Sequence, residues 1–325
     1  MSVVPDPAGE PTLPPLGYGA AALGNLYREL DDAGAQAVVD AAWDCGVRAY
    51  DVAPHYGLGL AERRLGRALA DRPRADYVLS TKVGRLLEPS PETAHLRDEG
   101  FHVPADVRRV WDASEAGVRR SLADSRDRTG IDRFDVAYLH DPEENVPPGS
   151  SVEAVLAEGL AALVRLREEG VVGAVGVGSK SEAALLAAVE TGLPDVVMLA
   201  GRYTLLDRSA ERELLPACLE HGTRVVAVGV FNSGALAEDV PRGDLPYEYG
   251  AMPSGVLDRL TRLADLCRRH GTTLPTAAIH FPLRHPAVAG VVLGADSADQ
   301  VRQNADRFAA TVPEAFWAEL ADERG

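Results

Sequence analysis

The sequence predicts an α/β protein whose single domain is a (β/α)₈ barrel, also called a TIM barrel. Short runs rich in β-branched residues alternate with longer helical patterns along nearly all of the 325 residues. The short runs are apolar on both faces, which is typical of strands in a parallel sheet covered by helices. Eight such runs occur, and eight is the number that closes this barrel. A doubly wound open sheet is the alternative fold.

The predicted strands follow one another at regular intervals. In chain order they cover residues 16–20, 47–53, 77–83, 134–140, 171–177, 195–200, 224–230 and 288–294. Between them, segments such as SVEAVLAEGLAALVRLREEG (151–170) repeat apolar residues every three or four positions, which predicts helices. Capping residues agree with this order: Gly170 and Gly222 close two of the helices, and Ser181 opens a third.

The barrel is expected to occupy residues 16–325, after a proline-rich N-terminal tail at residues 1–15. Two long polar insertions interrupt the rhythm, residues 85–107 after the third strand and residues 235–255 after the seventh. Both insertions would lie on the rim where the strands end. Barrels of this kind build their functional sites on that rim.

Composition narrows the class of partner. The net charge of −16 argues against binding to nucleic acid or to an anionic membrane surface. No apolar stretch approaches the ~20 residues that span a bilayer, and no secretory signal is visible, so a cytoplasmic protein is expected. The three cysteines, Cys45, Cys218 and Cys267, are far apart and are predicted to be buried thiols in a reducing compartment. Composition leaves a monomer and a homo-oligomer both open.

A dinucleotide-binding fingerprint at the first strand can be tested directly. The stretch LGYGAAALG (16–24) places Gly17, Gly19 and Ala22 at the spacing of that fingerprint. The fingerprint requires a long helix immediately after the glycines. A charged stretch follows here instead, so a Rossmann fold is not expected.

Polar residues stand at the ends of three consecutive predicted strands. Asp51 ends the second strand, Lys82 the third and His140 the fourth, while Tyr56 follows on a loop. Lys82 and Lys180 are the only lysines in the chain. A composition that uses arginine for its other cations keeps lysine where a compact, titratable ammonium is needed.

These four residue types together can move a proton to or from a carbonyl or hydroxyl oxygen. A free tyrosine has a pKa near ~10, and an adjacent ammonium favours its phenolate. Asp51 would hold that ammonium in place, and His140 would bind the substrate oxygen. Taken singly, His140 could be a core histidine and Asp51 a helix cap. A Schiff-base aldolase with Lys82 as nucleophile is a weaker alternative, because it leaves Tyr56 unexplained. No HExxH or GxSxG motif is present, so neither a metal centre nor a hydrolase is expected.

Three stretches resemble the aldo-keto reductase family. They are YDVAPHYGLGLAERRLG (50–66), STKVGR (80–85) and VAYLHDPE (136–143), and the likeness runs from about Gly17 to Leu320. The resemblance implies a barrel that binds an extended nicotinamide dinucleotide without a Rossmann fold. It also implies a catalytic tetrad of Asp51, Tyr56, Lys82 and His140.

The stretch GADSADQVRQN (294–304) is similar to the adenosine-binding segment of that family. Members that prefer NADPH carry a lysine at the position of Gly294 and an arginine at that of Gln300. The absence of both cations, with Asp296 close by, favours NAD, while Arg302 or a loop arginine would leave NADP possible. The cofactor contacts that the resemblance implies are Ser179, Phe231, Ser233, Gly234, Leu236, Gly294, Ala295, Asp296, Ser297, Gln300 and Asn304.

Further stretches, among them LAGRYTLLDR (199–208) and VFNSGALA (230–237), resemble the sugar-dehydrogenase branch of the family. This implies NAD(P)-dependent oxidation at C1 of an aldose of the L-fucose, L-galactose or D-arabinose type, giving the lactone. Substrate contacts are expected from Trp111, Tyr27, Arg85 and Asp141, with the loop residues His102, Tyr247 and Tyr249 as further candidates. The alternatives are NADPH-dependent reduction of aldehydes or ketones, a pyridoxal 4-dehydrogenase and a non-enzymatic dinucleotide-sensing subunit.

Overall fold

The chain forms one closed barrel of parallel strands surrounded by helices, and the computed structural model describes residues 13–98, 100–248 and 250–322. The barrel strands are β1 (Leu16–Gly19), β2 (Ala49–Asp51), β3 (Val78–Val83), β6 (Phe134–His140), β7 (Val172–Ser179), β8 (Val196–Ala200), β9 (Arg224–Val228) and β10 (Val288–Gly294). Two further strands are β4 (Arg85–Pro89) and β5 (Val107–Trp111). The helices are α1 (Asp32–Asp44), α2 (Leu60–Leu69), α3 (Glu115–Thr129), α4 (Val152–Glu168), α5 (Glu182–Glu190), α6 (Leu214–His221), α7 (Val256–Arg269), α8 (Leu274–His280), α9 (Ala298–Ala309) and α10 (Glu314–Asp322).

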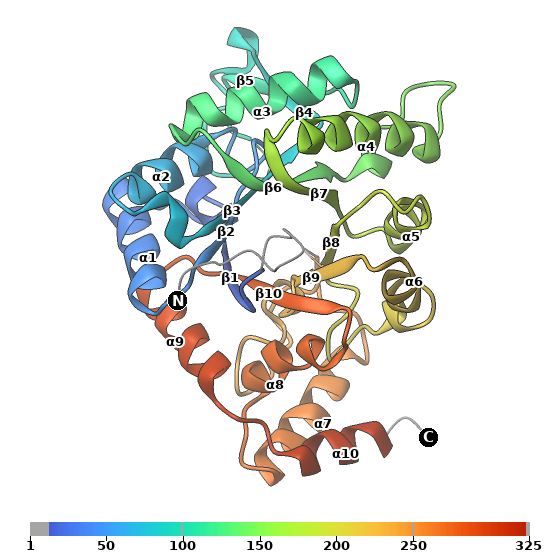
Figure 1. Cartoon of the computed structure of the whole chain (residues 1–325). Helices are drawn as coiled ribbons and strands as arrows, with labels where there is room; N and C mark the ends of the chain where they lie inside the picture. Colours follow the sequence, from blue (N-terminus) through green and yellow to red (C-terminus); the bar gives the residue numbers. More distant parts are fainter. Residues whose placement is uncertain (1–12, 99, 249, 323–325) are drawn as a thin grey trace.

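The strand order around the barrel is β1-β10-β9-β8-β7-β6-β3-β2, and the helices form an outer ring around these strands (Figure 1). Every neighbouring pair in the barrel is parallel, including β1 with β10, which closes it. The predicted (β/α)₈ barrel is therefore confirmed, and the doubly wound sheet is excluded. Gly17 and Gly19 belong to β1, and a short 3₁₀ turn follows them in place of a long helix.

Local sequence explains where the helices begin and end. Ser114, Ser151 and Ser181 precede α3, α4 and α5, and each side chain accepts a hydrogen bond from a backbone N–H three residues later. Gly222 ends α6 with φ +71°, a left-handed conformation that a glycine adopts without strain. The predicted caps at Ser181 and Gly222 are confirmed.

The core has two layers. Inside the barrel, Val136, Met198 and Val226 form a buried cluster with Tyr138, and Leu13 packs against this cluster. A larger layer lies between the strands and the helices and includes Leu156, a fully buried residue of α4. Residues 13–15 are thus part of the packed barrel, and the rest of the predicted N-terminal tail lies outside the described residues.

The first insertion is more ordered than its polar composition suggests. β4 and β5 pair antiparallel, with Arg85 opposite Trp111, and form a hairpin beside the barrel sheet. In the second insertion, residues 235–255, the described part holds only an isolated bridge between Tyr247 and Gly250. Tyr249, a predicted candidate for substrate contact, lies outside the described residues.

The cysteines divide into two kinds. Cys218 and Cys267 are buried, as predicted, but Cys45 is exposed, so the prediction was wrong for it. Cys45 is the C-terminal cap of α1, and the end of an outer helix faces solvent even where its apolar face is covered. Among the described residues, no helix has the length and apolarity needed to cross a bilayer.

Candidate active site

Strand register brings the predicted catalytic residues to one rim of the barrel. Asp51 at the end of β2 lies opposite Ser80 of β3, and Lys82 lies opposite Tyr138 of β6. His140 ends β6. Because all these strands run parallel, their last residues meet at the same edge. The structure thus gathers Asp51, Lys82 and His140 at one mouth, and the loop after β2 brings Tyr56 to them.

Lys82 is the centre of this group. Its Nζ donates to Asp51 Oδ2 at 2.5 Å and to Tyr56 Oη at 2.8 Å. The other oxygen of Asp51 accepts from Ser80 Oγ at 2.7 Å. Burial opposes the charge on Lys82, but Asp51 and Tyr56 outweigh it and hold the pKa of the ammonium above its ordinary value. The ammonium therefore stays charged at neutral pH and can stabilise an oxyanion on Tyr56.

Tyr56 is held by a close approach between two loops. Gly57, next to Tyr56, has φ +60°, and a Cβ there would lie 2.3 Å from the Gly24 carbonyl oxygen. A Cβ on Gly24 would lie 2.6 Å from the Tyr56 carbonyl carbon. Arg64 of α2 fixes the loop that carries Gly24, because its guanidinium donates to Leu23 O at 2.8 Å. The close approach of these two loops therefore restricts the position of the Tyr56 backbone.

Replacing Gly24 by alanine is expected to lower kcat about 100-fold, because the added methyl would displace Tyr56 by a substantial fraction of an ångström. Steady-state turnover beside thermal unfolding of the variant measures this. Gly100→Ala is the matched control, because a Cβ there meets nothing closer than 3.8 Å. Equal turnover in the two variants would contradict the positioning role of Gly24.

His140 is neutral in this site. Burial first, and then the charges of Arg85 and Lys82, hold the pKa of His140 well below its ordinary value. Its Nδ1 is buried without a hydrogen-bond partner, and its Nε2 lies 3.3 Å from Asp141 Oδ2. The His140 and Tyr56 rings meet edge to face with centroids 6.2 Å apart. A neutral imidazole beside the phenol can orient a substrate oxygen but cannot act as its acid at neutral pH.

The predicted substrate contacts on the hairpin side are engaged with one another. Arg85 is only 4% exposed and binds Asp141, and it also donates to Glu144 Oε2 at 3.0 Å. The guanidinium carbon of Arg85 lies 4.0 Å from the centroid of the Trp111 ring. A contact of Arg85, Asp141 or Trp111 with substrate stays a prediction. A substrate would have to bind these side chains while they keep their contacts with one another.

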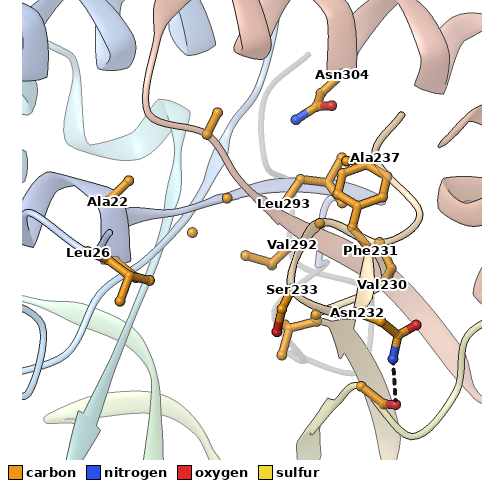
Figure 2. A pocket seen from close by; sticks show the side chains of 18 of the residues that line it. Ala22, Leu26, Val230, Phe231, Asn232, Ser233, Ala237, Val292, Leu293 and Asn304 are labelled. Carbon is orange, nitrogen blue, oxygen red and sulfur yellow. Dashed lines mark hydrogen bonds between the residues drawn. The ribbon is translucent and has the colours of Figure 1, made fainter. Parts of the chain in front are cut away.

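A cavity of about 520 Å³ extends away from the tetrad, a size typical of ligand sites. It begins at Asp51 and Tyr56 and reaches Gln300 and Asn304 of α9. Figure 2 shows Phe231 and Ser233 on one wall, Ala22 and Leu26 on the opposite side, and Asn304 at the far end. The Asn232 side chain in that wall donates to Gly201 O at 3.5 Å.

Most of the predicted cofactor contacts line this cavity. Those that do are Phe231, Ser233, Gly234, Gly294, Ala295, Asp296, Gln300 and Asn304, and Tyr27 joins them at the rim. Three do not line it. Ser179 is buried and bonded to Glu143, Leu236 is fully buried in the core, and Ser297 caps α9. A cofactor contact from these three stays a prediction.

Lys180 and Glu248 also line the cavity, and the sequence did not assign a role to either. Glu248 lies in the second insertion and is bound by Arg202, whose Nη2 is 3.1 Å from Glu248 Oε2. Burial lowers the pKa of Lys180. The scarcity of lysine in this chain was a usable signal for Lys180, whereas nothing local in the sequence marks Glu248.

The far end of the cavity carries a carboxylate. Arg28 binds Asp296 through its side chain and also donates to the Asp296 carbonyl oxygen at 2.8 Å. Asp296 Oδ1 is buried and has no hydrogen-bond partner, although the residue lines the cavity. A Cβ on Gly294 would meet nothing within 4 Å. This end therefore combines a carboxylate with open space, which fits an uncharged group better than an anionic one.

Comparison with known proteins agrees with this geometry. Residues 15–322 match the aldo/keto reductase family. The chain is 50% identical to D-threo-aldose 1-dehydrogenase of a Pseudomonas species, over 96% of this chain and 94% of that one. It is 38% identical to pyridoxal 4-dehydrogenase of Microbacterium luteolum, with the same shares of the two chains covered.

The fold has a close match among solved structures. A glycerol dehydrogenase from Gluconobacter oxydans superposes with a TM-score of 0.75 at 22% identity, covering 95% of this chain and 91% of that one. At that identity the match speaks for the barrel alone.

Proposed function

The chain belongs to the aldo/keto reductase family and is an oxidoreductase, and from this premise we propose that it oxidises an aldose at C1 to the lactone with NAD. The likeness to the Pseudomonas aldose dehydrogenase, spread over nearly the whole of both chains, carries the choice of substrate class. Its substrate is a small molecule. L-Fucose, L-galactose and D-arabinose are the aldoses that we expect it to accept.

Tyr56 acts as the general base in this proposal. Its Oη, 2.8 Å from the Lys82 ammonium, takes the proton of the C1 hydroxyl. Lys82 stabilises the phenolate that receives the proton, and Asp51 holds Lys82 in place. His140 is neutral, and the N–H of its imidazole donates to the C1 oxygen while Tyr56 takes the hydroxyl proton. The proton leaves Tyr56 for solvent after the product forms.

Nicotinamide cofactors serve this family, and the 520 Å³ cavity beside Tyr56 is the site that fits one. When bound, the nicotinamide ring supplies the acceptor for the hydride that leaves C1. Phe231 offers the apolar face of the cavity wall, and Asn304 and Gln300 offer amides at its far end. Two buried unpaired thiols suit a reducing compartment, so we place the enzyme in the cytoplasm.

The test of this proposal follows the absorbance of reduced nicotinamide while the protein meets L-fucose, L-galactose, D-arabinose and pyridoxal, each with NAD and with NADP. We expect turnover of at least one aldose with NAD. Oxidation of pyridoxal alone would favour the relative from Microbacterium luteolum as the guide to substrate. Reduction of simple aldehydes with NADPH, without sugar oxidation, would contradict the proposal.

The preference for NAD rests on the lack of a cation at Gly294 and Gln300 and on the carboxylate of Asp296. A ribose phosphate next to this carboxylate would be repelled, whereas a ribose hydroxyl carries no charge for the carboxylate to repel. Asp296→Asn removes the charge and releases Arg28, so kcat/KM with NADP is expected to rise about 10-fold. Asp299→Asn is the matched control, since Asp299 is exposed outside the cavity and binds Arg302 at 2.9 Å. An equal response of both variants would remove Asp296 as the determinant.

A further inference from the structure

His55 precedes Tyr56 in the loop after β2, and the proposed mechanism gives it no role. Its half-buried ring lies among the aromatic groups of the mouth. The ring centroids of His55 and His140 are 5.7 Å apart, those of His55 and Tyr56 are 6.2 Å apart, and Phe101 packs edge to face against His55 at 5.4 Å. His55 is therefore in direct contact with the groups that would surround the reacting carbon.

Two arginines of the hairpin face one nitrogen of this ring. Arg109 Nε donates to His55 Nδ1 at 2.6 Å, and Arg85 Nη1 lies 3.4 Å from the same atom. A guanidinium has only donors and no acceptor. His55 Nδ1 must therefore present its lone pair, and in a neutral imidazole the single proton is then on Nε2.

Arg109 is itself fixed, so the tautomer of His55 is fixed with it. Asp98 holds the Arg109 guanidinium through two contacts, at 2.5 Å and 3.0 Å, and Arg109 Nη2 also donates to His55 O at 3.3 Å. The ring has little tendency to gain a second proton. Burial, followed by the charges of Arg85 and Arg109, lowers the pKa of His55 to about 3, although Asp98 opposes this shift.

We propose that His55 is a substrate-binding residue whose Nε2–H donates to a hydroxyl or ring oxygen of the sugar next to the reacting carbon. No group in the described part of the chain accepts a hydrogen bond from Nε2. Nδ1 and Nε2 lie on opposite edges of the ring, so the donor is on the edge away from the two arginines. A fixed donor of this kind favours substrates that bring an acceptor to it over those that lack one.

This inference rests on the proposed function only for the identity of the substrate. Which nitrogen of His55 carries the proton can be measured without turnover. Imidazole ¹⁵N–¹H NMR of the full-length protein is expected to show His55 with a proton on Nε2 and none on Nδ1 from pH 5 to pH 9. A proton on Nδ1, or a ring that becomes charged within this range, would overturn the proposal.

Two substitutions distinguish the role of the Nδ1 acceptor from that of the Nε2–H donor. His55→Asn keeps an acceptor oxygen as far along the side chain as Nδ1, facing Arg109, but lacks the donor. His55→Gln keeps an N–H as far along the side chain as Nε2. Loss of one neutral hydrogen bond to substrate is expected to lower kcat/KM for an aldose about 10-fold in His55→Asn, with a smaller loss in His55→Gln.

The discriminating readout is a ratio between two substrates that differ only in hydroxyls, glyceraldehyde and propanal, measured in the direction of reduction. We expect the glyceraldehyde to propanal ratio of kcat/KM to fall about 10-fold in His55→Asn and to recover in His55→Gln. An unchanged ratio in His55→Asn would overturn the proposal, whether kcat/KM falls equally for both substrates or for neither. This ratio does not depend on sugar oxidation, so absence of aldose turnover in the wild-type protein would refute the proposed function and leave the His55 test valid.

Discussion

Replacing Tyr56 by phenylalanine is expected to lower kcat roughly 10³-fold, because the proton of the substrate hydroxyl then has no acceptor within the site. Lys82 Nζ loses its 2.8 Å contact with Oη, but its pair with Asp51 remains, so the fold should persist. Steady-state kinetics gives the loss in turnover, and titration of the dinucleotide shows whether binding is retained.

Tyr77→Phe is the matched control for this change. Tyr77 precedes β3 at the other end of the barrel and packs against Trp43, so removal of its hydroxyl should leave turnover within a factor of two or so of wild type. If Tyr56→Phe retained more than about a tenth of the wild-type kcat, another group would have to carry the proton.

Replacing Lys82 by methionine is expected to abolish turnover and also to lower the free energy of unfolding by about 3–5 kcal/mol, because the buried Asp51 would lose its ion-pair partner. The folded-state pKa of Lys82 is raised, so the stability that the ammonium contributes is present in full below about pH 10 and is lost only above it. Denaturant unfolding at pH 7 therefore measures the whole effect.

The double variant Asp51→Asn with Lys82→Met separates stability from catalysis. Removal of both charges should restore most of the unfolding free energy, since no unpaired charge stays buried, while turnover stays lost. Recovery of activity in the double variant would contradict the role of the ammonium. A Lys82→Met protein as stable as wild type would contradict the buried ion pair.

Much of the fold was predictable because its signals are local. Strands apolar on both faces, helices with a three- to four-residue period and serine caps such as Ser181 are all encoded within a few residues. The meeting of Asp51, Lys82 and His140 was predictable for a related reason. Parallel strands end on one rim, so residues at strand ends converge whatever the connecting helices are.

What could not be predicted depends on contacts between loops distant in sequence. The hairpin of β4 and β5 carries polar side chains, and Arg85 is buried there by contacts with Trp111 and with Asp141 and Glu144, which lie more than fifty residues away in sequence. The same holds for Arg109, which fixes the ring of His55 from the far strand of the hairpin. The exposure of Cys45 depended on where α1 ends, and helix ends are poorly specified by periodicity.

The most direct test of the central claim uses L-fucose carrying deuterium at C1, incubated with the enzyme and NAD. NMR of the recovered reduced nicotinamide is expected to show the deuterium on its ring, and the sugar product is expected to be the lactone without deuterium. Reduced nicotinamide without deuterium, or a deuterated sugar recovered unchanged under conditions where the enzyme oxidises other substrates with NAD, would contradict oxidation at C1.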